Sequence, residues 1–178
     1  MTTRHTVRLR PLELRHREKT RKWVNDPELM RLLNRERPVA QQEHEQWFAA
    51  LKERKDCTYF AIETVADGIH VGNIWLWNIE PRHRRAEVRI VVGTDYTGKG
   101  VGTQAISRLC DYAFEQLELH KLYAYVLAFN PRARRAFEKA GFVLEGTLSE
   151  DRWTGEGFTD VYLFGKLRRR EALKAQRL

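Results

Sequence analysis

EVRIVVGTDYTGKGVGTQAISRLCDYAFEQL, residues 87–117, is the stretch that decides the fold. Its apolar run VRIVV predicts a strand, the glycine-rich segment after it predicts a loop, and apolar residues at helical spacing then predict a helix. Gly98, Gly100 and Gly102 remove side chains at alternate positions, so a ligand can approach the backbone there. Free N–H groups and the dipole at the start of a helix favour an anion. The stretch therefore predicts a phosphate-binding site.

Two other interpretations fit the same glycines. The segment is also compatible with an ordinary turn between a strand and a helix. Residues 93–99 satisfy the GxxxxGK pattern of a nucleotide-hydrolysing phosphate loop. Gly100, however, stands where that loop needs a serine or threonine to hold magnesium, and antiparallel strands are expected before it. A P-loop-type nucleotide hydrolase is therefore the lesser alternative.

Composition indicates one domain. The chain has 178 residues, of which 42% are hydrophobic and 11% aromatic, enough for a single compact core. Its net charge of +8 suits an anionic ligand without requiring nucleic acid. Cys57 and Cys110 form no CxxC pair and have no metal-ligand spacing. We therefore expect no metal, no disulfide framework and a reducing compartment.

Both ends of the chain are rich in basic residues. The first 23 residues contain no apolar h-region, and no stretch approaches the ~20 apolar residues of a membrane span. We therefore expect a cytoplasmic protein without a membrane segment. Residues 169–178 are predicted to be a solvated basic tail rather than an arm that binds nucleic acid, and the domain itself is expected to span residues 1–168.

Periodicity along the chain alternates between strand and helix patterns. Strands are predicted at 6–10, 59–62, 71–77, 88–92, 121–128, 142–145 and 160–167. Helices are predicted as a polar stretch that ends at Trp23, and at 26–33, 43–51, 102–117 and 130–141. The turn residues Ala66-Asp67-Gly68 join the second and third strands as a hairpin. This order predicts an α+β fold with a mixed sheet.

Gly98–Gly102 and Asn130–Phe142, separated by a strand, together resemble the motifs of the GNAT superfamily of acetyl-CoA-dependent N-acetyltransferases. Residues 83–160 are similar to spermidine and ribosomal-protein alanine acetyltransferases. Residues 23–28 and 43–48 are instead similar to acetyltransferases that act on amino sugars attached to nucleotides. The resemblance implies a single GNAT-like domain, with a mixed, mostly antiparallel sheet of about seven strands flanked by about four helices.

The resemblance also implies how acetyl-CoA binds. The glycine loop would hold the pyrophosphate, and the pantetheine arm would pair with the backbone of the central strand where the next strand splays away. The implied coenzyme residues are Ile90, Val92, Thr97, Gly98, Lys99, Gly100, Val101, Gly102, Thr103, Asn130, Arg135 and Phe137. Two of them depart from the family pattern: Thr97 replaces a glutamine or arginine, and Phe137 replaces a tyrosine thought to protonate the leaving thiolate. Phenylalanine cannot donate that proton.

Acetyl transfer needs an uncharged amine, so a group must remove the amine's proton. Glu87 lies on the predicted central strand beside the loop and is our candidate for this base, with an ion pair to a neighbouring arginine as the structural alternative. Tyr125 stands where some family members carry a catalytic glutamate, and it also fits a strand aromatic. Cys110 is predicted on the buried side of its helix, so we expect direct attack in a ternary complex.

The sequence does not identify the acceptor amine. Glu28, His44 and Trp47 are candidates for its pocket, although His44 also fits a helix surface and Trp47 also fits core packing. A polyamine, an amino sugar and a protein N-terminus all stay open. A non-catalytic acyl-CoA-binding or RNA-binding module is the alternative from another class, motivated by Phe137 and the basic tail. The resemblance suggests a homodimer paired through edge strands, which the residues themselves do not decide.

Overall fold

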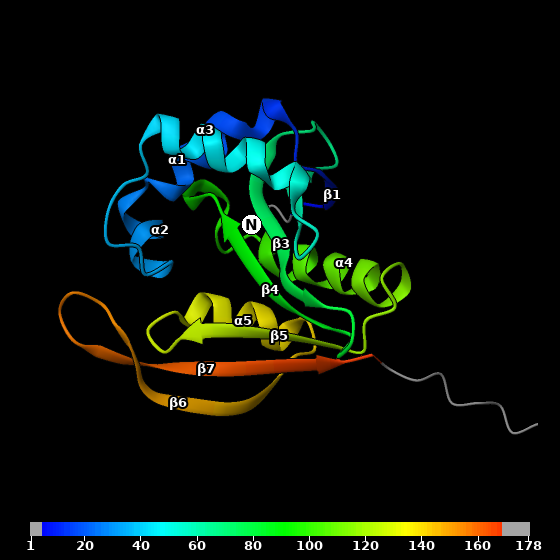
Figure 1. The fold of residues 1–178 in the computed structure, drawn as a ribbon, viewed down its shortest axis with the longest axis vertical. Coiled ribbons are helices and arrows are strands. Elements are labelled where there is room, and N and C mark those ends of the chain that lie inside the picture. The colour runs from blue at the N-terminus through cyan, green and yellow to red at the C-terminus, as the bar shows by residue number, and fades with distance from the viewer. Residues whose placement is uncertain (1–4, 169–178) are drawn as a thin grey trace, which may run out of the picture.

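Seven strands form one sheet in the computed structural model, which describes residues 5–168 (Figure 1). Their order across the sheet is β1-β2-β3-β4-β5-β7-β6. Neighbouring strands are antiparallel, except that β4 and β5 are parallel. The strands are β1 (Val7–Pro11), β2 (Thr58–Thr64), β3 (His70–Glu80), β4 (Arg85–Val92), β5 (Lys121–Leu127), β6 (Val143–Trp153) and β7 (Phe158–Leu167). The predicted α+β fold with a mixed, mostly antiparallel sheet is confirmed.

Five α-helices are present in the described residues, one more than the resemblance implied. They are α1 (Arg17–Val24), α2 (Pro27–Leu32), α3 (Gln41–Ala50), α4 (Val101–Glu115) and α5 (Pro131–Lys139). Asp26 caps α2 and Asn130 caps α5, each through a backbone N–H that donates to the side-chain oxygen over 3.1 Å. Both helices start with proline, a residue favoured at the first position of a helix. Between residues 5 and 168, no helix is both long and apolar enough to cross a bilayer.

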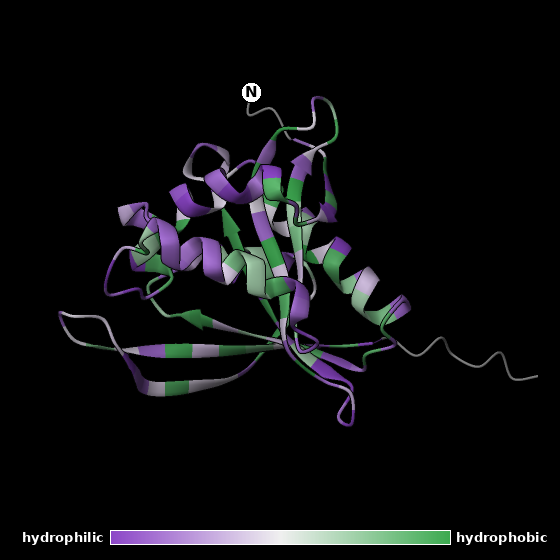
Figure 2. Cartoon of the chain, turned by 45° about the horizontal axis from the view of Figure 1, so that its top comes forward, coloured by the Kyte–Doolittle hydropathy of each residue, from purple (hydrophilic) through white to green (hydrophobic). Residues whose placement is uncertain are grey.

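The helices lie on both faces of the sheet. On one face, α4 and α5 cover the main core, where Leu109 of α4 and Ile74 of β3 are fully buried. On the other face, Trp23 of α1 packs against Val91 of β4. This two-sided covering follows from the period of a strand, because successive side chains point to opposite faces. Figure 2 shows the resulting alternation of hydrophilic and hydrophobic residues along the strands.

β4 and β5 diverge along their length. Their parallel ladder joins only Arg85–Glu87 to Lys121–Tyr123, although β4 continues to Val92 and β5 to Leu127. β5 stays paired with β7 throughout. Residues 88–92 therefore have no β5 partner, and the backbone groups on that edge of β4 are open. The splay implied by the resemblance is confirmed.

The last hairpin is longer than the sequence predicted. β6 continues to Trp153 rather than ending at 145, and β7 starts at Phe158 rather than at 160. Most side chains of β6 are exposed, so this part of the chain lacks the alternation of apolar and polar residues that marks a half-buried strand. The predicted tail at 169–178 lies outside the described residues.

Candidate functional site

The glycine loop opens α4 with available amide groups. Gly100 lies at the N-cap of α4 with φ +79°, and Gly98 precedes it with φ +75°. Glycine adopts these left-handed values without strain. Within residues 5–168, no side chain caps α4, so the amides of its first turn are free to meet a ligand. A Cβ at Gly98 would meet no described atom within 4 Å, and one at Gly100 would meet only Nε2 of Gln104, at 3.7 Å.

A cavity of about 410 Å³, here called the loop cavity, lies between this loop, β4 and α5. The coenzyme residues predicted from the sequence that line it are Ile90, Val92, Thr97, Gly98, Gly100, Val101, Gly102, Thr103, Asn130 and Arg135. Arg132 and Lys139 join Arg135 in lining it, and none of the lining residues in the described chain is acidic. The loop cavity is therefore positively charged, which suits phosphate groups.

Sequence reasoning missed Arg132 and Lys139. Their spacing of three and four residues from Arg135 places all three on one face of α5, which is the signal that could have found them. Two predicted coenzyme residues lie outside the loop cavity. Nζ of Lys99 lies 5.5 Å from the centre of the Tyr96 ring, and Phe137 is buried against Phe142, with 5.1 Å between ring centres.

A second cavity of about 460 Å³, here called the sheet cavity, adjoins the first. The two cavities share the lining residues Leu32, Leu33, Ile90, Val91, Asn130 and Ala133. Ile90 and Val91 belong to the part of β4 that has no β5 partner. A molecule in the loop cavity and a molecule in the sheet cavity would therefore meet where the two strands separate.

Aromatic side chains of β2 and β3 form the floor of the sheet cavity. Strand pairing places Trp75 opposite Arg89 and Trp77 opposite Glu87, and residues directly opposite each other share a face. Tyr59 stacks on Trp75, with 5.1 Å between ring centres and 12° between planes. The sequence predicted this hairpin but not its role, although the alternation of the two tryptophans signals a common face.

Glu87 lies in the sheet cavity and is 7% exposed. Its carboxylate accepts two hydrogen bonds from Arg89, from Nε at 2.7 Å and from a terminal nitrogen at 3.0 Å. The Arg89 guanidinium also lies 5.0 Å from the centre of a Trp77 ring. The ion pair considered as the structural alternative is therefore present, and both of its residues line the sheet cavity.

Of the other candidate residues for catalysis or acceptor binding, two line the sheet cavity and two do not. Tyr125, which is 43% exposed, and Trp47 line the sheet cavity. His44 does not: it is buried against Trp47, neither ring nitrogen has a hydrogen-bond partner in the described residues, and burial lowers its pKa. Glu28 lines neither cavity and instead pairs with Arg132 at 2.8 Å, which ties α2 to α5.

Cys110 is placed where the sequence predicted, on the buried side of α4. It is 1% exposed, and burial raises the pKa of its thiol to about 11. A thiol that stays protonated is a poor nucleophile, and Cys110 lines neither cavity. This placement agrees with direct attack and not with an acyl-cysteine intermediate.

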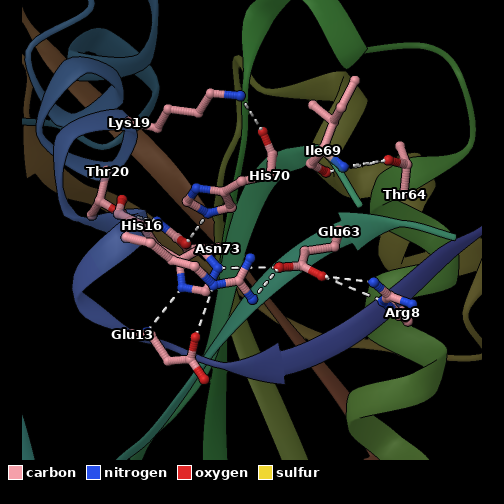
Figure 3. A network of polar contacts seen from close by, with 11 residues as sticks. Arg8, Glu13, His16, Lys19, Thr20, Glu63, Thr64, Ile69, His70 and Asn73 are labelled. Carbon is pink, nitrogen blue, oxygen red and sulfur yellow. Dashed lines mark hydrogen bonds and ion pairs between the residues drawn. The ribbon is translucent and has the colours of Figure 1, made fainter. Parts of the chain in front are cut away.

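A buried polar network holds α1 against β3 beside the sheet cavity (Figure 3). Nδ2 of Asn73 donates to Oγ of Thr20 over 2.9 Å, and both residues line the cavity. Nε2 of His70 lies 2.8 Å from Oδ1 of Asn73, and the nearby carboxylate of Glu63 lies 3.2 Å from Nε2 of His16. Sequence reasoning missed this network because its members come from separate segments and share no local pattern.

Comparison with known proteins agrees with this geometry. A family model described as an acetyltransferase (GNAT) domain matches residues 6–143. The spermidine N(1)-acetyltransferase of Escherichia coli K12 is 33% identical over 151 residues, which cover 85% of this chain and 80% of that protein. The spermidine N(1)-acetyltransferase of Vibrio cholerae is 36% identical over 102 residues, which cover 57% of this chain and only 58% of that protein.

A solved structure is also similar over most of its length. It is the crystal structure of spermidine N-acetyltransferase from Vibrio cholerae in complex with CoA and spermine, with a TM-score of 0.84 and 30% sequence identity. The match covers 90% of this chain and 95% of that one. The glycine loop, the splayed strands and these matches lead to one conclusion: the chain belongs to the GNAT family of N-acetyltransferases.

Proposed function

We propose that this N-acetyltransferase moves the acetyl group of acetyl-CoA to a primary amine by direct attack while both substrates are bound. The observation that carries the proposal is the meeting of the loop cavity and the sheet cavity at residues Ile90 and Val91. Coenzyme in the first cavity and amine in the second would bring the thioester and the nitrogen together, as a ternary-complex mechanism requires.

The coenzyme would be held mainly by backbone groups. The amides at the start of α4 would bind the pyrophosphate, with Arg135 and Lys139 adding positive charge. The pantetheine arm would extend along the edge of β4 that β5 leaves open, next to Ile90 and Val92. The Vibrio cholerae relative was solved in complex with CoA, which supports this choice of donor.

The chemical step would use a base and a backbone donor. The amine nitrogen forms a bond to the thioester carbon, and its proton passes to Glu87 directly or through water. A backbone N–H of β4 near Val91 would stabilise the oxyanion of the tetrahedral intermediate. The carbon–sulfur bond then breaks, and the thiolate takes a proton from water or from Tyr125, because Phe137 has none to give.

Thiol release from acetyl-CoA across a panel of amines tests this function. We expect thiol release that depends on both acetyl-CoA and an amine. An acyl-CoA-binding protein without activity would bind the coenzyme and release no thiol with any amine. An RNA-binding module would instead bind RNA with a steep dependence on salt concentration.

A homodimer and a cytoplasmic location, both expected from the sequence, stay predictions. The exposed edge strand β6 supports the dimer, since Val143 is 63% and Leu144 is 47% exposed there. A dodecameric structure of the Vibrio cholerae relative shows that a related chain assembles. Light scattering of the purified protein measures its state directly, and a monomer at all concentrations would contradict the dimer.

A further inference from the structure

The sheet cavity contains more positive than negative charge. Arg35, Arg89 and Arg152 line it, whereas Glu87 is the one carboxylate among its lining residues in the described chain. Glu87 is already paired with Arg89 at 2.7 Å. Arg152 pairs with Asp151, which does not line the cavity. A ligand with several ammonium groups would find no unpaired carboxylate among these lining residues.

Arg35 and Arg152 come from segments that meet beside the cavity. Nδ2 of Asn34 donates to the backbone oxygen of Trp153 over 3.1 Å, so the chain after α2 contacts the β6–β7 hairpin. Each arginine is the sequence neighbour of one of these two residues. Within residues 5–168, Arg35 forms no ion pair, so its guanidinium is available to a ligand.

We propose that the acceptor carries an anionic group, a carboxylate or a phosphate, in addition to its amine. This inference rests on the proposed acetyl transfer and names the class of its acceptor. Arg35 would bind the anionic group together with the nitrogens of Arg152 that stay free, since Asp151 contacts only one terminal nitrogen of Arg152. Guanidinium groups form strong hydrogen bonds to carboxylate and phosphate. The amine of the acceptor would then lie towards Glu87. The aromatic floor with Trp75 and Trp77 would pack against a flat or apolar part of the acceptor.

A polyamine fits this cavity poorly. A second ammonium group would approach Arg35 or Arg152, and like charges in a partly closed cavity repel each other. Spermine is bound in the Vibrio cholerae relative, so this chain and that relative are expected to differ in acceptor although they share a fold.

Matched amines test the charge of the acceptor. Glucosamine 6-phosphate against glucosamine isolates a phosphate, tryptophan against tryptamine isolates a carboxylate, and spermidine supplies a polycation. Binding of each to the CoA-loaded protein is measured by calorimetry, alongside thiol release from acetyl-CoA. We expect the anionic member of at least one pair to bind roughly tenfold more tightly than its partner and more tightly than spermidine. The pair that responds identifies carboxylate or phosphate.

A matched pair of variants tests the assignment to Arg35. Arg35→Gln should remove most of the preference for the anionic amine and leave the affinity for CoA unchanged. Arg37→Gln removes an arginine two residues away that pairs with Glu43 at 2.9 Å and does not line the cavity, so the preference should persist. Equal loss in both variants would mean a general effect of charge and would overturn the assignment.

The outcomes separate this inference from the proposed function. Tightest binding of spermidine, or no advantage for either anionic amine, overturns the inference and leaves acetyl transfer standing. Tight binding of an anionic amine with no thiol release from any amine supports the charge of the ligand and refutes the proposed reaction.

Discussion

Glu87 and Arg89 are the two residues on which the proposed reaction centre depends. They occupy alternate positions of β4, so both side chains lie on the face that the aromatic floor shares. Two hydrogen bonds from Arg89 fix the orientation of the Glu87 carboxylate. Because Glu87 also lines the sheet cavity, its carboxylate can reach an amine bound there. The ion pair and the catalytic role are therefore compatible, with Arg89 as the residue that positions Glu87.

Replacement of Glu87 by glutamine should slow the chemical step. The amide cannot accept the amine's proton, so we expect kcat to fall on the order of 100-fold while the affinity for acetyl-CoA stays within about twofold. Steady-state kinetics and calorimetry measure the two quantities. Glu80→Gln is the matched control, because Glu80 also pairs with an arginine, Arg85 at 2.8 Å, but lines neither cavity. Wild-type turnover of Glu87→Gln at every pH would remove Glu87 from the mechanism.

Neighbouring arginines of α5 allow a similar comparison for the coenzyme. Arg135 lines the loop cavity, whereas Arg134 faces away and pairs with Glu138 at 2.9 Å. Arg135→Gln should weaken CoA binding by about tenfold, the typical effect of losing one hydrogen bond to a charged group. Arg134→Gln should not change it. Calorimetric titration with CoA decides between them, and equal affinities would exclude Arg135 from the coenzyme site.

At the scale of elements, the strand, loop and helix of residues 87–117 were predictable because the signal is local. Apolar runs, glycines and helical spacing fix each part without help from the rest of the chain. The strand extent of β6 was not predictable, since its pairing with β7 needs no apolar pattern of its own. The aromatic floor was also missed, because Tyr59 and Trp75 stack only once β2 and β3 pair in the register that places them opposite each other.

A substitution at Gly100 tests the proposed binding of coenzyme at the start of α4. A valine there would be held at φ +79°, which costs roughly 1–2 kcal/mol, and its side chain would occupy the space in front of the amides. Gly100→Val should therefore lose both stability and measurable CoA affinity. Gly155 has φ +89° in the β6–β7 hairpin and open space around it, so Gly155→Val should lose similar stability but keep CoA affinity. Loss of affinity in both variants would attribute the effect to folding.

At the scale of the whole molecule, the functional site depends on how the helical layer joins the sheet. Thr20 of α1 and Asn73 of β3 line the sheet cavity and are joined by one hydrogen bond of the buried network (Figure 3). Sequence periodicity does not predict this network, because histidine, asparagine and glutamate in a strand are usually expected at the surface. Burial and partners appear only once the layers pack, which is why the sequence predicted more of the residues that line the loop cavity than of those that line the sheet cavity.

This network should make stability depend on pH. Burial lowers the pKa of His70 to about 4, against 6.5 for the free side chain. Between these values the unfolded chain binds a proton that the folded chain does not, so the free energy of unfolding falls as pH drops from 6.5 towards 4. We expect a loss of about 2 kcal/mol between pH 7 and pH 5 from His70 alone, measured by urea unfolding. His44, whose pKa burial also lowers, adds a loss of the same sign.

Substitution of His70 isolates its contribution to the pH dependence. At pH 7, His70→Gln should have a lower free energy of unfolding, because the hydrogen bond between His70 and Asn73 is changed. On going to pH 5, however, its free energy of unfolding should fall less than that of the unsubstituted protein. The pKa of Glu63 is lowered from 4.5, so protonation of Glu63 reduces the free energy of unfolding mainly below pH 4.5. The measurement stops at pH 5 to keep this second loss out of the comparison. His120→Gln, at an exposed position, should keep the original pH dependence. If His70→Gln also keeps the original pH dependence, protonation of His70 does not weaken the contact between α1 and β3. The sheet cavity should then keep its shape in mild acid.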